Sequence, residues 1–304
     1  MSLLVLSDHE VRRLLTMEEC VEAMDAVLQA LTRGELHQPL RSMTRPSSAE
    51  SLMGLMPAHR GGKSAAWSLK EIVVTPDNPM RGLDAHQGAV LLHDGETGEL
   101  RAILNASPIT AIRTAAVSAV ATRALARRGA RTVAIVGSGV QGKTHEEAMR
   151  AVLDEPEIRM WSRSDGGSAE AIVRGADVVC TCTTSREPVV RHEWLAPGAH
   201  VNAVGSSVPT GRELDEETIR AATLIVDRRE SALNEAGELA IPCLGDEQID
   251  AELGEVLTGA HAGRSTDDEL TVFKSLGLAV EDLAAAELVV GKAREQGAGT
   301  EVEF

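Results

Sequence analysis

The sequence has very few aromatic residues: two Phe, three Trp and no Tyr among 304 residues. Proteins that hold single-stranded nucleic acids stack several such rings against the bases, so this chain lacks the means to build that kind of surface. Basic residues are also fewer than acidic ones, 30 against 46, and the net charge of −16 repels nucleic-acid phosphates and anionic membranes. We therefore expect neither nucleic acid nor a membrane as a partner.

Cysteine is scarce and long apolar runs are missing. The chain shows no C-x-x-C spacing of zinc or redox sites in its four cysteines, Cys20, Cys180, Cys182 and Cys243. His86 and His200 have no second ligand at metal spacing, so no metal site is expected. No apolar run approaches 18 residues and the N-terminus lacks a basic leader, which predicts a soluble protein of the reducing cytoplasm.

The first third of the chain has sequence patterns typical of an α+β domain. After Thr16-x-x-Glu19, a capping box, apolar residues recur at helical spacing as far as Gly34. From Leu36 to Leu104 short apolar runs alternate with Pro, Gly, Asn and Asp, and residues 94–98 read as a hairpin turn. This pattern of short apolar runs and turn residues predicts an antiparallel sheet.

The sequence pattern changes at Pro108. An Ala-rich helix is predicted over 109–129, followed by a strand, Thr132–Val136, and a second helix from Lys143. Strands and helices then alternate, which predicts a parallel sheet. The expected strands are 158–161, 178–181, 200–204 and 223–227, and the expected helices are 168–174 and 213–222. A last helix is predicted over Ser275–Glu295, before a polar tail expected to fray.

A glycine-rich turn follows the strand Thr132–Val136 and precedes a helix. It fits G-x-G-x-x-G, whose glycines allow a tight turn and a close approach of the backbone to a pyrophosphate. The alternative is a turn without a ligand, but the strand-turn-helix context favours a dinucleotide. The residues expected to contact it are Gly137, Ser138, Gly139, Val140 and Gln141.

The end of the next predicted strand indicates which dinucleotide binds. An NAD site usually places a carboxylate there to bind the ribose hydroxyl, whereas this chain has Ser162, Arg163 and Ser164, with no acid before Asp165. Hydroxyls and a guanidinium suit a 2′-phosphate. NADPH is therefore favoured over NADH, although Arg163 could also be a solvated surface charge.

Three basic residues are candidates for binding an anion. Arg113 lies near the start of a predicted helix, whose dipole adds to its positive charge. Lys70 interrupts an apolar run, where an unpaired ammonium would be costly, and Arg41 lies in the same β-rich segment. Taken alone, Arg41 and Lys70 would each more often be a salt-bridge partner, whereas an anion is expected at Arg113.

These features occur together with several longer strings. They are Thr110–Ala116 (TAIRTAA), the GSGVQG turn, Leu-Met-Pro at 55–57, Pro76-x-Asn78, 197–205 (PGAHVNAVG) and 273–282 (FKSLGLAVED). With them the chain resembles the ornithine cyclodeaminase/mu-crystallin family over nearly its whole length. The resemblance implies a homodimer with an α+β substrate-binding and dimerisation domain, 1–113 with 273–304, and a Rossmann NADP-binding domain with a parallel sheet, 114–272.

The resemblance also implies roles for individual residues. Arg41, Lys70 and Arg113 would surround the carboxylate of a small imino or amino acid. Ser207 is expected to contact the substrate. Further cofactor contacts are expected at His86, Thr114, Val204 and Ser275.

Two departures from the cyclodeaminase pattern bear on the reaction. Those enzymes place an Asp where this chain has Ser207, and a Glu where it has Gly54. Without these carboxylates there is no strong base for ammonia loss. Mu-crystallin-type ketimine reductases show a Ser and a Gly at these places. The chain is also short after Arg163, where four residues, 164–167, replace a helix and strand, which shortens the expected sheet edge beside the adenine.

The sequence therefore predicts an NADPH-dependent ketimine reductase acting on a small imine carboxylate, such as a cyclic pyrroline- or piperideine-2-carboxylate. Arg41, Lys70 and Arg113 would place the substrate, and Lys70 would give or hold the proton on nitrogen. Three alternatives stay open: an ornithine or lysine cyclodeaminase, an amino acid dehydrogenase, and a non-catalytic NADPH-dependent binding protein.

Overall fold

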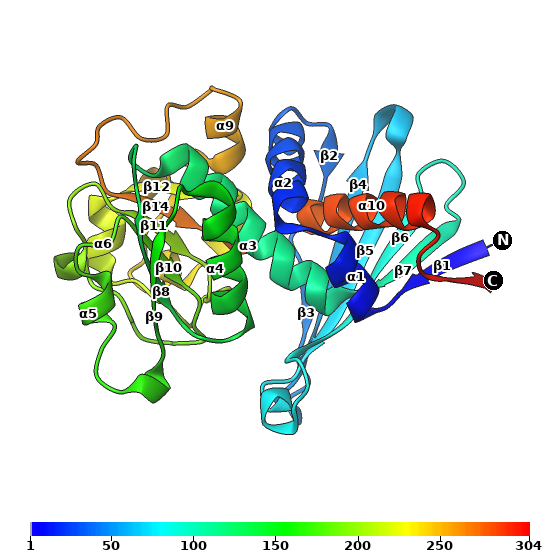
Figure 1. Cartoon of the computed structure of the whole chain (residues 1–304), viewed down its shortest axis with the longest axis horizontal. Coiled ribbons are helices and arrows are strands. Elements are labelled where there is room, and N and C mark those ends of the chain that lie inside the picture. The colour runs from blue at the N-terminus through cyan, green and yellow to red at the C-terminus, as the bar shows by residue number, and fades with distance from the viewer. Residues whose placement is uncertain (1) are drawn as a thin grey trace. The chain divides into compact units, whose positions relative to one another are not determined.

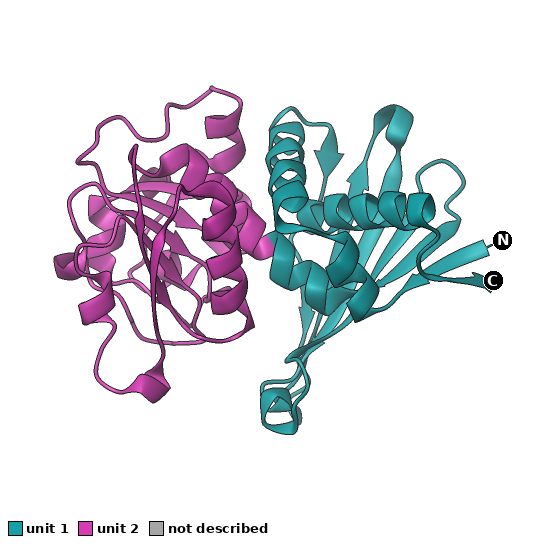
Figure 2. Cartoon of the chain, viewed as in Figure 1, with its two compact units in different colours: residues 1–113, 278–304 teal, residues 114–277 magenta. Residues whose placement is uncertain are grey.

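The computed structural model describes residues 2–304, which form two compact units (Figure 2). Unit 1 contains the chain up to Arg113 together with Leu278–Phe304, and unit 2 is Thr114–Gly277. The second boundary falls at 278 rather than at the expected 273. The reason is that β14 (Thr271–Lys274) pairs on both sides within the sheet of unit 2.

Unit 1 is built on an eight-stranded sheet in the order β15-β1-β7-β6-β5-β4-β2, with β3 paired to β4. Its strands are β1 (Ser2–Leu6), β2 (Leu36–His37), β3 (Ser42–Thr44), β4 (Leu52–Arg60), β5 (Ala66–Val74), β6 (His86–Asp94), β7 (Leu100–Asn105) and β15 (Thr300–Glu303). Strands β2 to β7 pair antiparallel, as predicted, and only β1 and β7 run parallel.

Helices cover one face of this sheet. They are α1 (Asp8–Leu14), α2 (Met17–Thr32) and α10 (Ala279–Gln296), and α10 lies across β4, β5 and β6 (Figure 1). Alternate residues of β5 are buried beneath α10, as a period of two requires: Ala66, Ser68, Lys70 and Ile72. Ser7 begins α1 with a capping box.

The C-terminal segment differs from its prediction in two ways. Helix α10 begins at Ala279 instead of Ser275, because Leu276 N and Gly277 N donate to the carboxylate of Asp227. The tail does not fray: β15 pairs antiparallel with β1. The polar composition suggested an unpaired tail, but backbone hydrogen bonds to an edge strand need no apolar side chains.

Unit 2 is a seven-stranded parallel sheet in the order β13-β12-β14-β11-β10-β8-β9. Its strands are β8 (Thr132–Val136), β9 (Glu157–Trp161), β10 (Val178–Thr181), β11 (His200–Ala203), β12 (Thr223–Val226), β13 (Ala251–Glu252) and β14. The expected α/β fold with a Rossmann-type sheet is confirmed. Strand β9 is an edge strand.

The helices between β7 and β14 differ from their predicted bounds: α5 and α6 are shorter than predicted, whereas α3 and α4 begin earlier. The Ala-rich helix α3 runs Ala106–Leu125, and the others are α4 (Val140–Val152), α5 (Glu170–Val173), α6 (Glu216–Ala221), α7 (Arg229–Glu235), α8 (Gly237–Ala240) and α9 (Leu253–Leu257). At α6 the prediction began at Glu213, but Asp215 is the N-cap and Glu213 is buried as part of a polar cluster. Within residues 2–304 no helix has the length and apolar character needed to cross a membrane.

Candidate active site

Lys70 lies in the middle of β5 on the face covered by α10, and only 1% of its surface is exposed. A buried ammonium needs a partner of opposite charge. Asp282, in the first turn of α10, provides it, with Oδ2 2.7 Å from Lys70 Nζ. The strand and the helix are thus joined by an ion pair inside unit 1.

Arg113 of α3 shares the same carboxylate. Its Nε donates to Asp282 Oδ1 at 3.0 Å, and its Nη1 donates to Glu281 Oε2 at 2.9 Å. The side chain of Arg113 is 5% exposed, and both acids are fully buried. We call the set Lys70, Arg113, Glu281 and Asp282 the Lys70 centre.

Charges at the Lys70 centre set the protonation of Lys70. Burial lowers the pKa of Lys70 to about 8; the carboxylate of Asp282 opposes this shift, while the charges of Arg113 and Arg41 add to it. An ammonium group with a pKa this close to neutrality can release a proton in the physiological range. The centre can therefore exchange a proton.

The two other unit 1 candidates lie within electrostatic range of Lys70. Arg41, half-buried just before β3, and His86, the exposed first residue of β6, complete the group. Partial burial of its ring lowers the pKa of His86, and the charges of Lys70 and Arg113 lower it further. The structure therefore brings Lys70 and Arg113 into one cluster and leaves Arg41 and His86 within electrostatic range of it.

Sequence reasoning missed the acids of this centre. Glu281 and Asp282 were noticed only as part of a family string, without a role. The available signal was two adjacent acids at the start of an apolar helix, since such groups are rarely buried without a cationic partner. Gln38 supports them by accepting a hydrogen bond from Val280 N at 3.0 Å.

In unit 2 the glycine-rich turn has the geometry that a pyrophosphate needs. Gly137 has φ +119°, and a Cβ there would overlap the carbonyl oxygen of Cys182. A Cβ at Gly142 would overlap the carbonyl oxygen of Gly137, whereas the space beside Gly139 is open. Gly139 is the N-cap of α4, so the first N–H groups of the helix face this space. These residues fit a dinucleotide.

The end of β9 forms a compact turn. Ser162 caps the short 3₁₀ helix Arg163–Asp165, with Asp165 Oδ2 accepting from Ser162 N at 2.7 Å and from Ser162 Oγ at 2.9 Å. The Oγ atoms of Ser162 and Ser164 are 2.7 Å apart. Asp165 is thus engaged with the turn itself, while the side chain of Arg163 is exposed.

The remaining unit 2 candidates lie at the carboxyl ends of β11 and β14 or on α3. Val204 N donates to Thr181 O at 3.1 Å and Ser275 N donates to Ala203 O at 3.0 Å, which holds both positions in place. Ser207 lies in the exposed stretch 207–210. Thr114, the first residue of unit 2, is buried in α3.

Neither the histidines nor the cysteines form a metal site. Within residues 2–304 no group of three or more His, Cys, Asp or Glu side chains is arranged to hold a metal ion. His200 is fully buried, with its ring nitrogens 2.9 Å from Thr271 Oγ1 and 3.2 Å from Asn202 Oδ1. Burial raises the pKa of Cys180 to about 12, so this thiol packs as a small apolar group.

Comparison with known proteins gives the same family over almost the whole chain. The model of the "Ornithine cyclodeaminase/mu-crystallin family" matches residues 1–172 and 164–297. The two matches meet within the stretch where β9 is followed by a short crossing to α5. This is the place where the sequence departs in length from the family pattern.

Individual relatives are similar at the level of sequence and fold. Mouse ketimine reductase mu-crystallin is 38% identical over 88% of this chain and 90% of its own length. Delta(1)-pyrroline-2-carboxylate reductase of Bacillus cereus is 36% identical over 99% of this chain and 100% of its own. The corresponding reductase of Thermococcus litoralis, solved with NADH and L-proline, is 34% identical, with a TM-score of 0.93 over 98% of this chain and 100% of its own.

Proposed function

The chain belongs to the ornithine cyclodeaminase/mu-crystallin family, and we propose that it uses NADPH to reduce a small cyclic ketimine carboxylate to the amino acid. It is an oxidoreductase acting on C=N bonds. The observation that carries the proposal is the Lys70 centre, in which cationic groups and a titratable ammonium meet in a buried place.

The substrate carboxylate is placed by the three cations. Arg113 is fixed by two acids, so it can receive an anion without losing rotamer freedom in the process. Lys70 and Arg41 add positive charge from β5 and from the segment before β3. Orienting the carboxylate in this way also orients the adjacent C=N carbon, which supplies proximity for the reaction.

Lys70 controls the protonation of the substrate nitrogen. A protonated imine is a good electrophile, and an ammonium with a pKa of about 8 can keep that nitrogen protonated at neutral pH. The nicotinamide, when bound, supplies the hydride. Asp282 holds Lys70 in position and favours its charged form.

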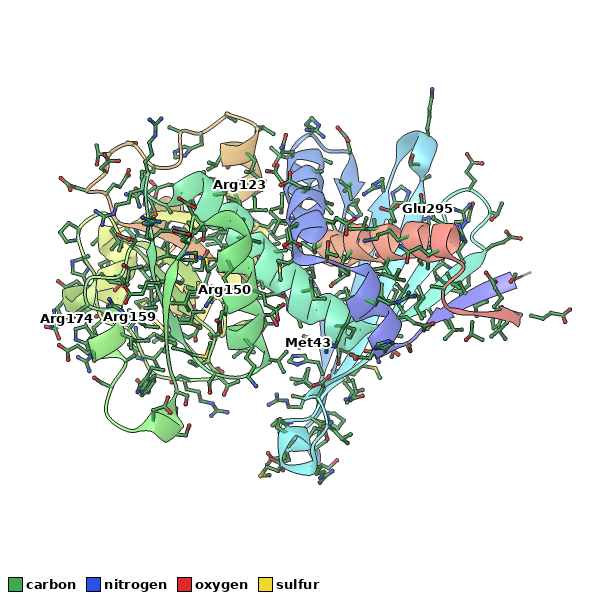
Figure 3. All side chains as sticks on the ribbon, viewed as in Figure 1. Met43, Arg123, Arg150, Arg159, Arg174 and Glu295 are labelled. Carbon is green, nitrogen blue, oxygen red and sulfur yellow. The ribbon has the colours of Figure 1, made fainter. Side chains whose placement is uncertain are left out.

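Two positions argue against ammonia elimination. Ser207 is a hydroxyl where a cyclodeaminase has a base. At Gly54 a side chain would meet Met43 Sδ at 3.1 Å and Ile72 Cγ1 at 3.5 Å, so the place of the family's Glu is lined by apolar atoms (Met43 is labelled in Figure 3). A diamino acid would find no partner there for its distal ammonium.

The preference for NADPH rests on the turn after β9. Arg163 is exposed and offers a guanidinium to a 2′-phosphate, with Ser162 and Ser164 beside it. The only carboxylate of the turn, Asp165, already accepts two hydrogen bonds from Ser162. It is therefore poorly placed to bind a ribose hydroxyl, as NADH would require.

A homodimer is proposed from the uncovered face of the unit 1 sheet. Five strands place half-buried apolar residues in register across that face: Pro57, Leu69, Leu91, Ile103 and Val5. Trp67 on the same face is 48% exposed. A continuous apolar row of this kind is typical of a protein interface, and a second copy would cover it.

The reaction is tested with cyclic and acyclic imine carboxylates and NADPH, followed by absorbance. We expect turnover of a cyclic ketimine, kcat/KM within about tenfold of wild type for Ser207→Ala, and a far larger loss for Lys70→Ala. The wild type incubated with NAD and labelled ornithine or lysine should form no proline or pipecolate. Catalytic formation of either product by mass spectrometry would make the chain a lyase.

A further inference from the structure

Unit 2 contains a second buried charged cluster, which none of the roles above uses. Glu213, Glu238 and Lys274 expose 0%, 1% and 1% of their surfaces. A buried charge is costly unless a partner compensates it, so the contacts of these side chains indicate which parts of the fold the cluster stabilises. We call these three residues the Lys274 cluster.

Lys274, the last residue of β14, connects two strand ends. Its Nζ donates to Ser206 O at 2.6 Å and to Ala203 O at 3.3 Å, and it lies 3.3 Å from Glu238 Oε2. Two of the three N–H groups of the ammonium thus donate to carbonyl oxygens, and the Glu238 carboxylate lies within ion-pair distance. Lys274 therefore fixes the backbone at the carboxyl end of β11.

Glu213 binds the same region from the other side. Its carboxylate accepts four hydrogen bonds: from Gly205 N at 2.6 Å, Thr181 Oγ1 at 2.8 Å, and Thr183 N and Oγ1, both at 2.7 Å. Burial raises the pKa of Glu213 above its ordinary value, although the charge of Lys274 and the bonds from Thr183 oppose this shift. Only the ionised form can accept all four bonds, because a protonated oxygen would face a donor.

The second acid of the cluster, Glu238, connects the other two residues. Glu238 Oε1 accepts from Glu213 N at 2.9 Å, while its other oxygen faces Lys274. A Cβ at Gly205 would overlap the backbone of Thr183 and approach Glu213 Oε1, so this packing admits only glycine. The ends of β10 and β11 are thus held as one rigid body, directly before exposed Ser207.

The two halves of a dinucleotide would lie against different strand ends of this sheet. In the strand order β11-β10-β8-β9, the direction of winding reverses between β10 and β8, and dinucleotides bind across that point. The glycine-rich turn after β8 and Ser162–Ser164 after β9 serve the pyrophosphate and the adenosine ribose. The ends of β10 and β11 face the other half, which is the nicotinamide.

We propose that the Lys274 cluster positions the nicotinamide half of the cofactor by fixing the strand-end segments 181–183 and 203–207. Its residues act through the backbone and touch neither cofactor nor substrate. The inference rests on the proposed function for the identity of the ligand. It predicts that the cluster affects the binding of the nicotinamide without affecting that of the adenosine half.

The test compares two ligands on the full chain by calorimetry: NADPH, and 2′-phospho-ADP-ribose, which lacks the nicotinamide. Glu213→Gln places an amide N–H against the donors of Gly205 or Thr183. We expect it to weaken NADPH about tenfold or more and 2′-phospho-ADP-ribose less than about twofold. The matched control is Glu216→Gln, on the exposed surface of α6, which should change neither affinity.

A second, less disruptive variant keeps the test valid if Glu213→Gln does not fold. Thr183→Val removes one donor to Glu213 and should weaken NADPH about fivefold, again without affecting the shorter ligand. A parallel loss of both affinities, or no change in either, would overturn the proposal. A wild-type chain that binds both ligands but reduces no imine would refute the proposed reaction, and the affinity comparison would still decide the role of the cluster.

Discussion

Replacing Asp282 by Asn should shift the pH dependence of the reaction. Asp282 is the group that raises the pKa of Lys70 against burial, with its Oδ2 2.7 Å from Lys70 Nζ. Asn keeps the shape and an acceptor for Arg113 Nε but removes the charge. Burial and the charges of Arg113 and Arg41 then act on Lys70 without that opposition.

The size of the shift follows from the buried geometry. Removing one partner of a buried ion pair costs about 3–5 kcal/mol, and one pKa unit corresponds to about 1.4 kcal/mol. We therefore expect the pKa of Lys70 to fall by about two units or more from its value near 8. Since the ammonium exists below the pKa, its fraction at pH 7 falls from about nine-tenths to about a tenth or less.

The assay is kcat/KM for the ketimine between pH 6 and 10. The wild type should lose activity as pH rises through about 8, and Asp282→Asn should lose it at lower pH. Glu295→Gln, at the exposed end of α10 (Figure 3), is the matched control and should leave the profile unchanged. An alkaline limb that stays in place in a folded Asp282→Asn variant would refute the role assigned to Lys70.

Three further predictions address the other parts of the site. Arg163→Ala should lower NADPH affinity about ten- to a hundredfold and leave NADH affinity nearly unchanged in fluorescence titrations; equal affinities of the wild type for both cofactors would contradict the assignment. Arg113→Ala should lower kcat/KM about a hundredfold or more, and an unchanged value would remove Arg113 from the substrate site. Leu91→Asp, in the apolar row, should give a monomer by light scattering, while Leu83→Asp, 54% exposed in a loop, should not; a Leu91→Asp protein of unchanged mass would locate any interface elsewhere.

Local patterns in the sequence were sufficient for much of the fold. The alternation along 36–104 predicted the antiparallel sheet, and the strand-turn-helix around Gly137 predicted the start of the parallel one. Helix ends were less predictable. Glu213 was predicted to be the first residue of a helix, because nothing in the local sequence reveals that Thr181, Thr183 and Gly205 would supply hydrogen bonds to it.

The residues of the candidate site also divide into those that the sequence could predict and those that it could not. Lys70 could be chosen from the sequence because a cation in an apolar run is unusual, and Arg113 because it lies near the start of a predicted helix. Their counter-ion could not be, since Asp282 follows Arg113 by 169 residues and Lys70 by more than 200. Pairing over such a separation depends on how the chain returns to unit 1, and residue periodicity does not encode that return.

The division of unit 1 into two chain segments determines the order in which its buried charges can be neutralised during synthesis. Residues up to Arg113 leave the ribosome first, and α10 leaves only after all of unit 2. Until Ala279–Gln296 emerges, Lys70 and Arg113 have neither Asp282 nor Glu281 beside them, and the face of the sheet beneath α10 has no cover. A nascent chain can therefore complete its parallel sheet, whose strands all lie between Thr132 and Lys274, before the Lys70 centre exists.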